Sequence, residues 1–190
     1  MHVHVIYLHG FLSSPQSAKA QQTKHYASKH LPSLNLHIPQ LSGNITKAIA
    51  SVEALIASLP PQPLRFIGSS MGGFLSTYFV EKYGGKAVLV NPAVLPYRLL
   101  SHYQGEHINP HSKERFFIHH QSIELLKALE PSALENVGAY KVLLQTGDET
   151  LDYRLAEQKY WGSQLTVEQG GDHSFVNFED HLPSIFDFLR

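Results

Sequence analysis

Residues Gly68-Ser69-Ser70-Met71-Gly72 follow the apolar run 64–67 and precede the apolar run 74–80. The first run is typical of a buried strand and the second of a buried helix, so the five residues form the turn between them. A G-x-S-x-G turn in this context is a nucleophile elbow, which holds the central serine, here Ser70, on a sharp and strained bend. Glycine on both sides leaves room for the bend, and the helix N-terminus presents backbone N–H groups to the serine. The segment therefore predicts a strand–turn–helix unit with Ser70 as a nucleophile.

A serine hydroxyl is a poor nucleophile unless a base removes its proton, so an acid and then a histidine should follow Ser70 in the chain. Residues 143–148 are a strand-like run that ends in a turn at Asp148, and residues 169–173 are a glycine turn that ends at His173. In this arrangement Asp148 orients His173, and His173 takes the serine proton and later protonates the leaving group.

The identity of the acid has alternatives in the sequence. Asp148 is preferred because it is nearest the end of the strand, where the sheet fixes its direction. Glu149 and Asp152 lie in or just after the same turn, and Asp152 is better explained as a residue at a helix N-terminus. Asp172 directly precedes His173, but neighbouring side chains in a tight turn rarely face each other.

Two backbone amides are candidates for an oxyanion hole. A tetrahedral intermediate needs N–H donors that point at its new negative charge. The Met71 amide directly follows the nucleophile. The second donor should come from the loop that residues 9–11 open after the first strand, and the Phe11 amide is preferred there, with Leu12 as the alternative.

Strand-like and helix-like runs alternate along the 190 residues, which predicts an α/β fold with a mostly parallel sheet flanked by helices. We expect one domain over residues 1–190. The first helix is capped either by Ser14, with Pro15 at the first helical position, or by Ser17. The expected strands are 3–8, 34–38, 64–67, 87–90, 142–144 and 165–167; the later helices are 45–59, 74–80, 122–129, 151–160 and 178–189.

The alternation lapses between about residues 93 and 131, which we call the cap segment. Long segments of this kind inside compact domains are usually functional, so a small lid over the site is expected; the alternative is a surface excursion packed on the sheet edge. Four aromatic residues of the cap segment either line an acyl pocket or anchor the lid: Tyr97, Tyr103, Phe116 and Phe117.

Composition excludes several other functions. The formal net charge is −1 and there is no basic run, so nucleic acid and anionic membranes are not expected partners. There is no cysteine, which excludes disulfides and cysteine-ligated metals. The N-terminus runs straight into the first strand and lacks the features of a signal peptide, so a cytoplasmic protein is expected. Thirteen histidines are present; a metal site among those between His102 and His120 is the less favoured explanation, and a solvated surface the favoured one.

Several motifs together are similar to a known family. They are Leu8-His9-Gly10-Phe11, Gly68-Ser69-Ser70-Met71-Gly72-Gly73, Val90-Asn91-Pro92-Ala93, Gln145-Thr146-Gly147-Asp148-Glu149 with Leu151-Asp152-Tyr153, and Gly170-Gly171-Asp172-His173. The chain thus resembles the YqiA-like esterases, which are small bacterial α/β-hydrolases. The resemblance implies the α/β-hydrolase fold, hydrolysis of carboxylic esters and possible use of acyl-CoA thioesters. It also places the nucleophile on Ser70, the acid on Asp148 and the base on His173.

The expected function is therefore a serine hydrolase that cleaves small esters or thioesters of short to medium acyl groups and needs neither cofactor nor metal. Two alternatives stay open. A serine aminopeptidase would use the same machinery but needs an acidic pair near the site, and only Glu106 and Glu114 precede the helix of the cap segment. A hydrolase fold without activity, used as a binding module, would normally lack the serine or the histidine.

Overall fold

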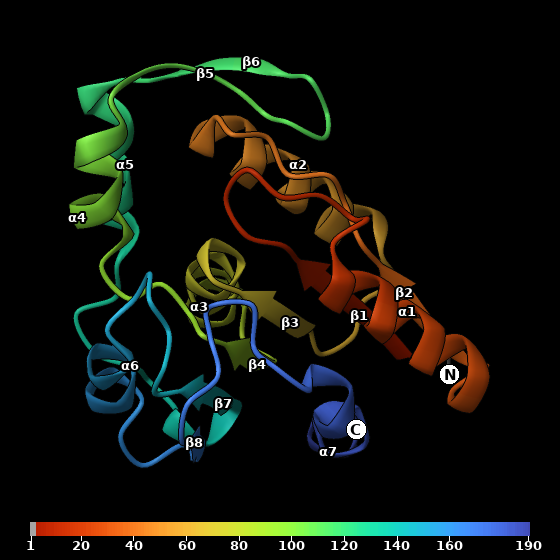
Figure 1. Cartoon of the computed structure of the whole chain (residues 1–190). Coiled ribbons are helices and arrows are strands. Elements are labelled where there is room, and N and C mark those ends of the chain that lie inside the picture. The colour runs from red at the N-terminus through yellow and green to blue at the C-terminus, as the bar shows by residue number, and fades with distance from the viewer. Residues whose placement is uncertain (1–2) are drawn as a thin grey trace.

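The computed structural model describes residues 3–190, and Figure 1 shows a central sheet between two layers of helices. The sheet has six parallel strands in the order β2-β1-β3-β4-β7-β8. Because all six are parallel, their carboxyl ends meet at one edge, where α/β folds bind ligands. The strands are β1 (Val3–Leu8), β2 (Leu34–His37), β3 (Arg65–Ser69), β4 (Lys86–Val90), β7 (Tyr140–Gln145) and β8 (Gln164–Glu168).

The expected α/β architecture is confirmed, and two apolar layers hold it together. Side chains alternate between the faces of a strand, so Val5 and Tyr7 of β1 pack on one side of the sheet and Ile6 and Leu8 on the other. Helices α1 (Ala18–His30) and α7 (Leu182–Leu189) cover the face of Tyr7, while α2 (Ile45–Ser58), α3 (Met71–Tyr83) and α6 (Tyr153–Lys159) cover the face of Leu8. Burial of both faces explains why the strands read as continuous apolar runs.

Of the two starts considered for the first helix, the structure has the one at Ser17. Helix α1 begins at Ala18 with Ser17 as its N-cap residue. The alternative with Ser14 and Pro15 is wrong because the Ser14 hydroxyl accepts a hydrogen bond from the Gln16 amide at 3.1 Å, within a turn that precedes the helix.

The cap segment contains more regular structure than the sequence predicts. After β4 come α4 (Pro96–Leu100), a 3-10 turn (Ser101–Tyr103), the antiparallel hairpin of β5 (Gly105–Ile108) and β6 (Arg115–Ile118), and α5 (His120–Leu129). The strand β5 has the sequence Gly-Glu-His-Ile, which carries little intrinsic strand preference. Its pairing with β6 therefore depends on contacts with the rest of the protein.

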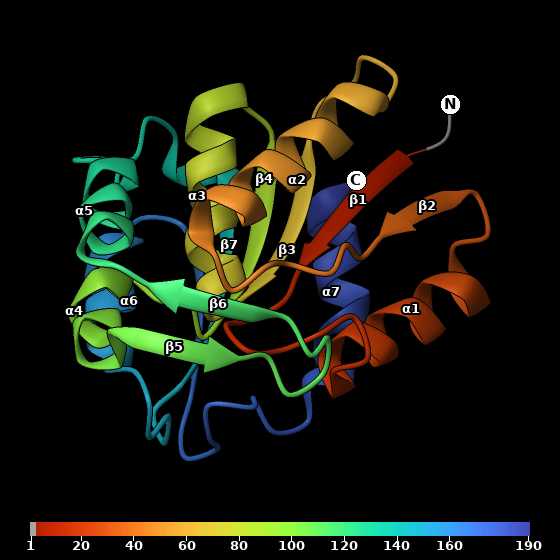
Figure 2. The same ribbon diagram turned by 90° about the horizontal axis from the view of Figure 1, so that it is seen from above.

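Those contacts fix the hairpin beside the loop that follows β1, as Figure 2 shows from above. The Phe116 ring meets the Phe11 ring edge-on, with 5.9 Å between centroids. The Asn109 amide donates to the Ser13 carbonyl oxygen at 3.2 Å. The Glu114 carboxylate accepts from the Ser42 hydroxyl at 2.6 Å. The hairpin thus covers the carboxyl edge of the sheet, next to the loop expected to form the oxyanion hole.

The histidines of the cap segment do not gather into a metal site. Over residues 3–190, no three side chains of the types that bind metals lie close enough to share an ion. His107 instead places Nε2 2.6 Å from the Tyr103 carbonyl oxygen and stacks on Phe116 with 5.7 Å between centroids. No helix within residues 3–190 is long and apolar enough to cross a bilayer.

Candidate active site

Ser70 sits in strained backbone at the junction of β3 and α3. Its φ is 55° and its ψ is −118°, a region that non-glycine residues rarely adopt. Hydrogen bonds on both sides hold the bend: the Ser70 amide donates to the Val90 carbonyl oxygen at 3.1 Å, and the Ser70 carbonyl accepts from Gly73 at 2.9 Å and Ala93 at 3.0 Å. The surrounding chain therefore enforces the conformation that the sequence motif predicts.

The two outer glycines of the motif are required for space. A Cβ on Gly68 would lie 2.4 Å from the Gly72 carbonyl oxygen, and a Cβ on Gly72 would lie 1.9 Å from that of Leu8. Both contacts are with backbone atoms that cannot rotate away. Close packing of α3 on β1 and β3 thus explains why the motif has glycine at both positions.

The structure brings together the three side chains predicted for catalysis, although they are far apart in the sequence. His173 Nε2 lies 3.1 Å from Ser70 Oγ, and His173 Nδ1 lies 2.8 Å from Asp148 Oδ2. The Asp148 side chain is 1% exposed, whereas that of His173 is 24% exposed. A buried carboxylate, an imidazole and a hydroxyl in one hydrogen-bonded row have the geometry of a Ser-His-Asp triad.

The three alternative acids lie elsewhere. Asp152 is the N-cap residue of α6 and accepts from the Arg154 amide at 3.0 Å. Glu149 accepts from the His173 backbone amide at 3.0 Å, so it contacts the loop of the histidine and not its ring. Asp172 has a buried Oδ1 atom without a hydrogen-bond partner among the described residues.

Asn91 and Gln145, which occur in the family motifs but had no predicted role, hold the histidine loop. The Asn91 amide donates to the Asp172 carbonyl oxygen at 3.0 Å, and its Oδ1 accepts from the Gln145 backbone amide at 3.0 Å. The Gln145 Oε1 accepts from the amides of Asp172 at 3.2 Å and Val176 at 2.8 Å. Both residues are buried polar groups at the ends of apolar strands, and that pattern is the signal that could have identified them.

The amides of Met71 and Phe11 are the two expected oxyanion donors, and the structure gives the surroundings of each. Met71 is the first residue of α3, where a backbone N–H has no acceptor within the helix. Phe11 and Leu12 line the cavity beside Ser70, and Leu12 has a φ of 55°. Within residues 3–190, no protein atom accepts a hydrogen bond from the Phe11 or Met71 amide, so both remain available to a ligand.

His9 fixes the loop that contains Phe11. Its ring is buried, Nδ1 lies 2.9 Å from the Gly10 carbonyl oxygen, and Nε2 accepts from the Leu41 amide at 3.0 Å. This pair of bonds requires the neutral ring with its proton on Nδ1. Burial lowers the pKa of His9, in agreement with the neutral form.

The depressed pKa of His9 predicts that the protein loses stability in mild acid. In the unfolded chain a histidine takes up its proton below about pH 6.5, whereas folded His9 resists protonation. The unfolded state therefore binds more protons, and stability falls as the pH decreases from about 6.5 through the folded pKa. We expect a lower thermal midpoint at pH 5.5 than at pH 7.5, measured by circular dichroism.

The matched comparison is His9→Gln against His25→Gln, because His25 is exposed on α1. His9→Gln should shrink the difference between the two midpoints, and His25→Gln should leave it unchanged. An equal acid-induced drop in both variants would contradict the assignment to His9.

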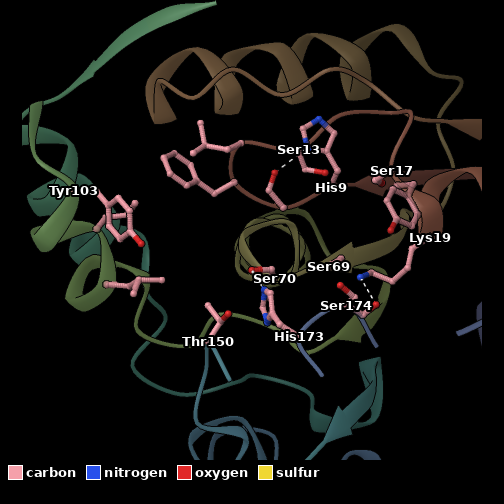
Figure 3. Close-up of a pocket in the computed structure, with 16 residues that line it drawn as sticks. His9, Ser13, Ser17, Lys19, Ser69, Ser70, Tyr103, Thr150, His173 and Ser174 are labelled. Carbon is pink, nitrogen blue, oxygen red and sulfur yellow. Dashed lines mark hydrogen bonds between the residues drawn. The ribbon is translucent and has the colours of Figure 1, made fainter. Parts of the chain in front are cut away.

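A cavity of about 310 Å³ opens beside Ser70 and His173. Figure 3 shows Tyr103 on one side of Ser70 and Ser17 and Lys19 on the other. Of the four aromatic residues expected to line or anchor the lid, only Tyr103 lines this cavity. Phe116 packs on Phe11, and Phe117 lies 46% exposed on the outside. The other lining residues come from β1 and the loop after it, from β3, from α4 and from the loops that carry Asp148 and His173: Tyr7, His9, Gly10, Phe11, Leu12, Ser13, Ser69, Leu99, Leu100, Thr150 and Ser174.

Known structures share this fold at low sequence identity. Alpha/beta hydrolase domain-containing protein 10 from mouse superposes with a TM-score of 0.69 and 16% identity, over 98% of this chain and 90% of that one. Est1E from Butyrivibrio proteoclasticus, solved with ferulic acid bound, gives a TM-score of 0.69 and 13% identity, over 98% of this chain and 87% of that one. At these identities the likeness establishes the α/β-hydrolase fold.

The sequence itself gives the closer relationship. Residues 4–190 match the family described as "Uncharacterised protein family (UPF0227)", which is the YqiA-like family that the motifs resemble. The match spans the elbow, the acid turn and the histidine loop. The chain therefore belongs to the UPF0227 family, the YqiA-like esterase family of α/β-hydrolases.

Proposed function

We propose that the protein is a serine esterase that cleaves carboxylic esters or thioesters of short to medium acyl groups through an acyl-enzyme on Ser70. The observation that carries the proposal is the row Ser70–His173–Asp148, with contacts of 3.1 and 2.8 Å. Membership of a hydrolase-fold family supports the reaction class. A cavity of about 310 Å³ supports a small acyl group.

In the proposed mechanism, His173 Nε2 accepts the Ser70 proton while Oγ attacks the carbonyl carbon. Asp148 keeps the other imidazole proton on Nδ1 and stabilises the imidazolium. The amides of Met71 and Phe11 donate to the oxyanion. His173 then protonates the leaving alcohol or thiol, and a water repeats the sequence to release the acid and restore Ser70. These groups supply every step, so the proposal requires neither metal nor cofactor.

The two alternative functions receive less support. An aminopeptidase needs acidic side chains that bind the substrate amine, but no Asp or Glu is among the described residues that line the cavity. Glu114 bonds to Ser42 and Gly43, and Glu106 pairs with Arg115 at 3.6 Å on the outside of the hairpin. A silent binding module would not need a complete row of nucleophile, base and acid.

The proposal is tested with p-nitrophenyl acetate, butyrate, hexanoate and decanoate, and with the acyl-CoA thioesters of the same acids. We expect turnover with a kcat/KM that declines for chains longer than the cavity can hold. Rapid-mixing experiments should show a burst of one p-nitrophenol per Ser70 if deacylation is slower than acylation. Hydrolysis of none of these compounds, by protein shown to be folded, would contradict the proposal.

A further inference from the structure

One end of the catalytic cavity carries hydroxyl groups without hydrogen-bond partners. Tyr7 extends from β1 on the face that α1 covers, and it is only 1% exposed, yet no described residue bonds its hydroxyl. The same holds for the side chains of Ser17 and Ser69, which line the same cavity. None of these three oxygens is a fully buried atom, because among the described residues only Asp172 Oδ1 is both buried and without a partner; each hydroxyl is therefore accessible from the cavity and free to bond a ligand there. Three such hydroxyls give this end of the cavity a polar lining.

Lys19 adds a positive charge to this end of the cavity. Its Nζ atom donates to the Ser174 carbonyl oxygen at 2.7 Å, which uses one of its three protons (Figure 3). Within residues 3–190, no carboxylate lies within 4 Å of that nitrogen. Burial lowers the pKa of Lys19, and the more distant charges of Asp172 and Asp148 oppose this shift.

The position of Lys19 does not serve the helix that bears it. Lys19 is the second residue of α1, and a cation in the first turn of a helix interacts unfavourably with the helix dipole. Nor does Lys19 satisfy Asp172, because the buried Oδ1 of that residue has no hydrogen-bond partner among the described residues. The lysine therefore has two donors and a charge that the fold leaves available to the cavity.

We propose that Tyr7, Ser17 and Lys19 form a subsite for a carboxylate, so that the preferred substrates are esters with a second, ionised carboxyl group close to the scissile bond. The inference rests on the proposed esterase function and names its substrate class. An ammonium and two hydroxyls that can all donate are the complement of a carboxylate. Ser69 lies between this subsite and Ser70 in the cavity wall.

The opposite end of the cavity fits the apolar part of such a substrate. Leu99, Leu100 and Tyr103 of the cap segment line it, and Figure 3 places Ser70 and His173 between Tyr103 and Lys19. An acyl-CoA thioester does not meet this description, because its phosphates are separated from the thioester by the long pantetheine arm. Ser70 and Lys19 line the same cavity of about 310 Å³. A carboxylate bound by Lys19 therefore lies close to the ester bond that Ser70 attacks.

The test uses two pairs of esters in which one member carries an ionised carboxylate and the other a neutral group at the same position. On the acyl side, mono-p-nitrophenyl adipate is compared with p-nitrophenyl hexanoate. On the leaving-group side, 4-carboxyphenyl butyrate is compared with 4-carbamoylphenyl butyrate. The wild type should favour the anionic ester of at least one pair, and the pair identifies the half of the substrate that the subsite binds. Lys19→Met should reduce kcat/KM for that ester by about 10- to 100-fold and for its neutral partner by much less.

Two further variants separate binding from structure. Tyr7→Phe removes a hydroxyl that makes no hydrogen bond with the protein, so it should leave the thermal midpoint unchanged and lower kcat/KM for the anionic ester by about 10-fold. Lys24→Met removes the same charge from an exposed position of α1. It should leave kcat/KM unchanged for both the anionic and the neutral ester. If Lys19 had a purely structural role, Lys19→Met would instead lower kcat/KM equally for both esters of a pair.

The outcomes distinguish this inference from the proposed function. Turnover of the neutral esters without any preference for the anionic partners, or a preference that survives Lys19→Met, would overturn the carboxylate subsite and leave the esterase intact. Failure of the folded wild type to hydrolyse all four esters would overturn both.

Discussion

Replacement of Ser70 by alanine should abolish covalent labelling by a fluorophosphonate and lower kcat/KM for p-nitrophenyl butyrate by about 10⁴-fold or more. Fluorophosphonates react with serines that a neighbouring base activates, so labelling requires no knowledge of the substrate. Ser70 Oγ is the hydroxyl that lies 3.1 Å from His173 Nε2. We expect one adduct per wild-type chain by intact mass spectrometry and none on Ser70→Ala.

The matched control is Ser28→Ala, which removes an exposed hydroxyl of α1 and should leave labelling and turnover unchanged. Thermal unfolding of all three proteins shows whether Ser70→Ala folds. Labelling of Ser70→Ala would move the nucleophile to another residue. A folded wild type that stays unlabelled would mean that the row of Ser70, His173 and Asp148 does not activate the serine, and would favour the binding module.

The features that the sequence predicts well are those whose cause is local. The elbow can be recognised because the steric requirement falls on Gly68 and Gly72, within two residues of Ser70. The acid and the base can be located because each follows an apolar strand, and parallel strands bring their carboxyl ends to the same edge. The order of these elements in the chain is therefore enough to predict which side chains meet.

The features that the sequence does not reveal depend on contacts between distant segments. Strand β5 pairs with β6 while the hairpin is fixed by Phe11 and Ser42, which belong to other parts of the chain. Lys19 begins a polar helix and reads as an ordinary solvated lysine, and Tyr7 reads as one more apolar residue of β1. Only the packing of α1 against β1 shows that both face the cavity of Ser70.

Asp148→Asn should cost about 10³- to 10⁴-fold in kcat/KM, whereas Asp152→Asn should leave activity close to that of the wild type. Both carboxylate oxygens of Asp148 act as acceptors. Oδ1 accepts from the amides of Thr150 at 2.9 Å and Leu151 at 2.8 Å, and Oδ2 faces the Nδ1 atom of His173 at 2.8 Å. An asparagine must replace one of these oxygens by an NH₂ group.

If the new NH₂ faces His173, the ring must carry its proton on Nε2, and it can no longer accept the proton of Ser70. If the NH₂ faces the two backbone amides, donors meet donors and the turn at Thr150 and Leu151 loses its hydrogen bonds. Either orientation disables the base or displaces it. Asp152 differs because it caps α6, and asparagine caps a helix about as well as aspartate does.

The measurement is kcat/KM for p-nitrophenyl butyrate in both variants, together with their thermal midpoints. Near-equal midpoints with a large difference in rate would establish that Asp148 acts on the chemistry through His173. A large loss of activity in Asp152→Asn with little loss in Asp148→Asn would reassign the acid, because the hydrogen bond between Asp148 and His173 would then be dispensable for catalysis.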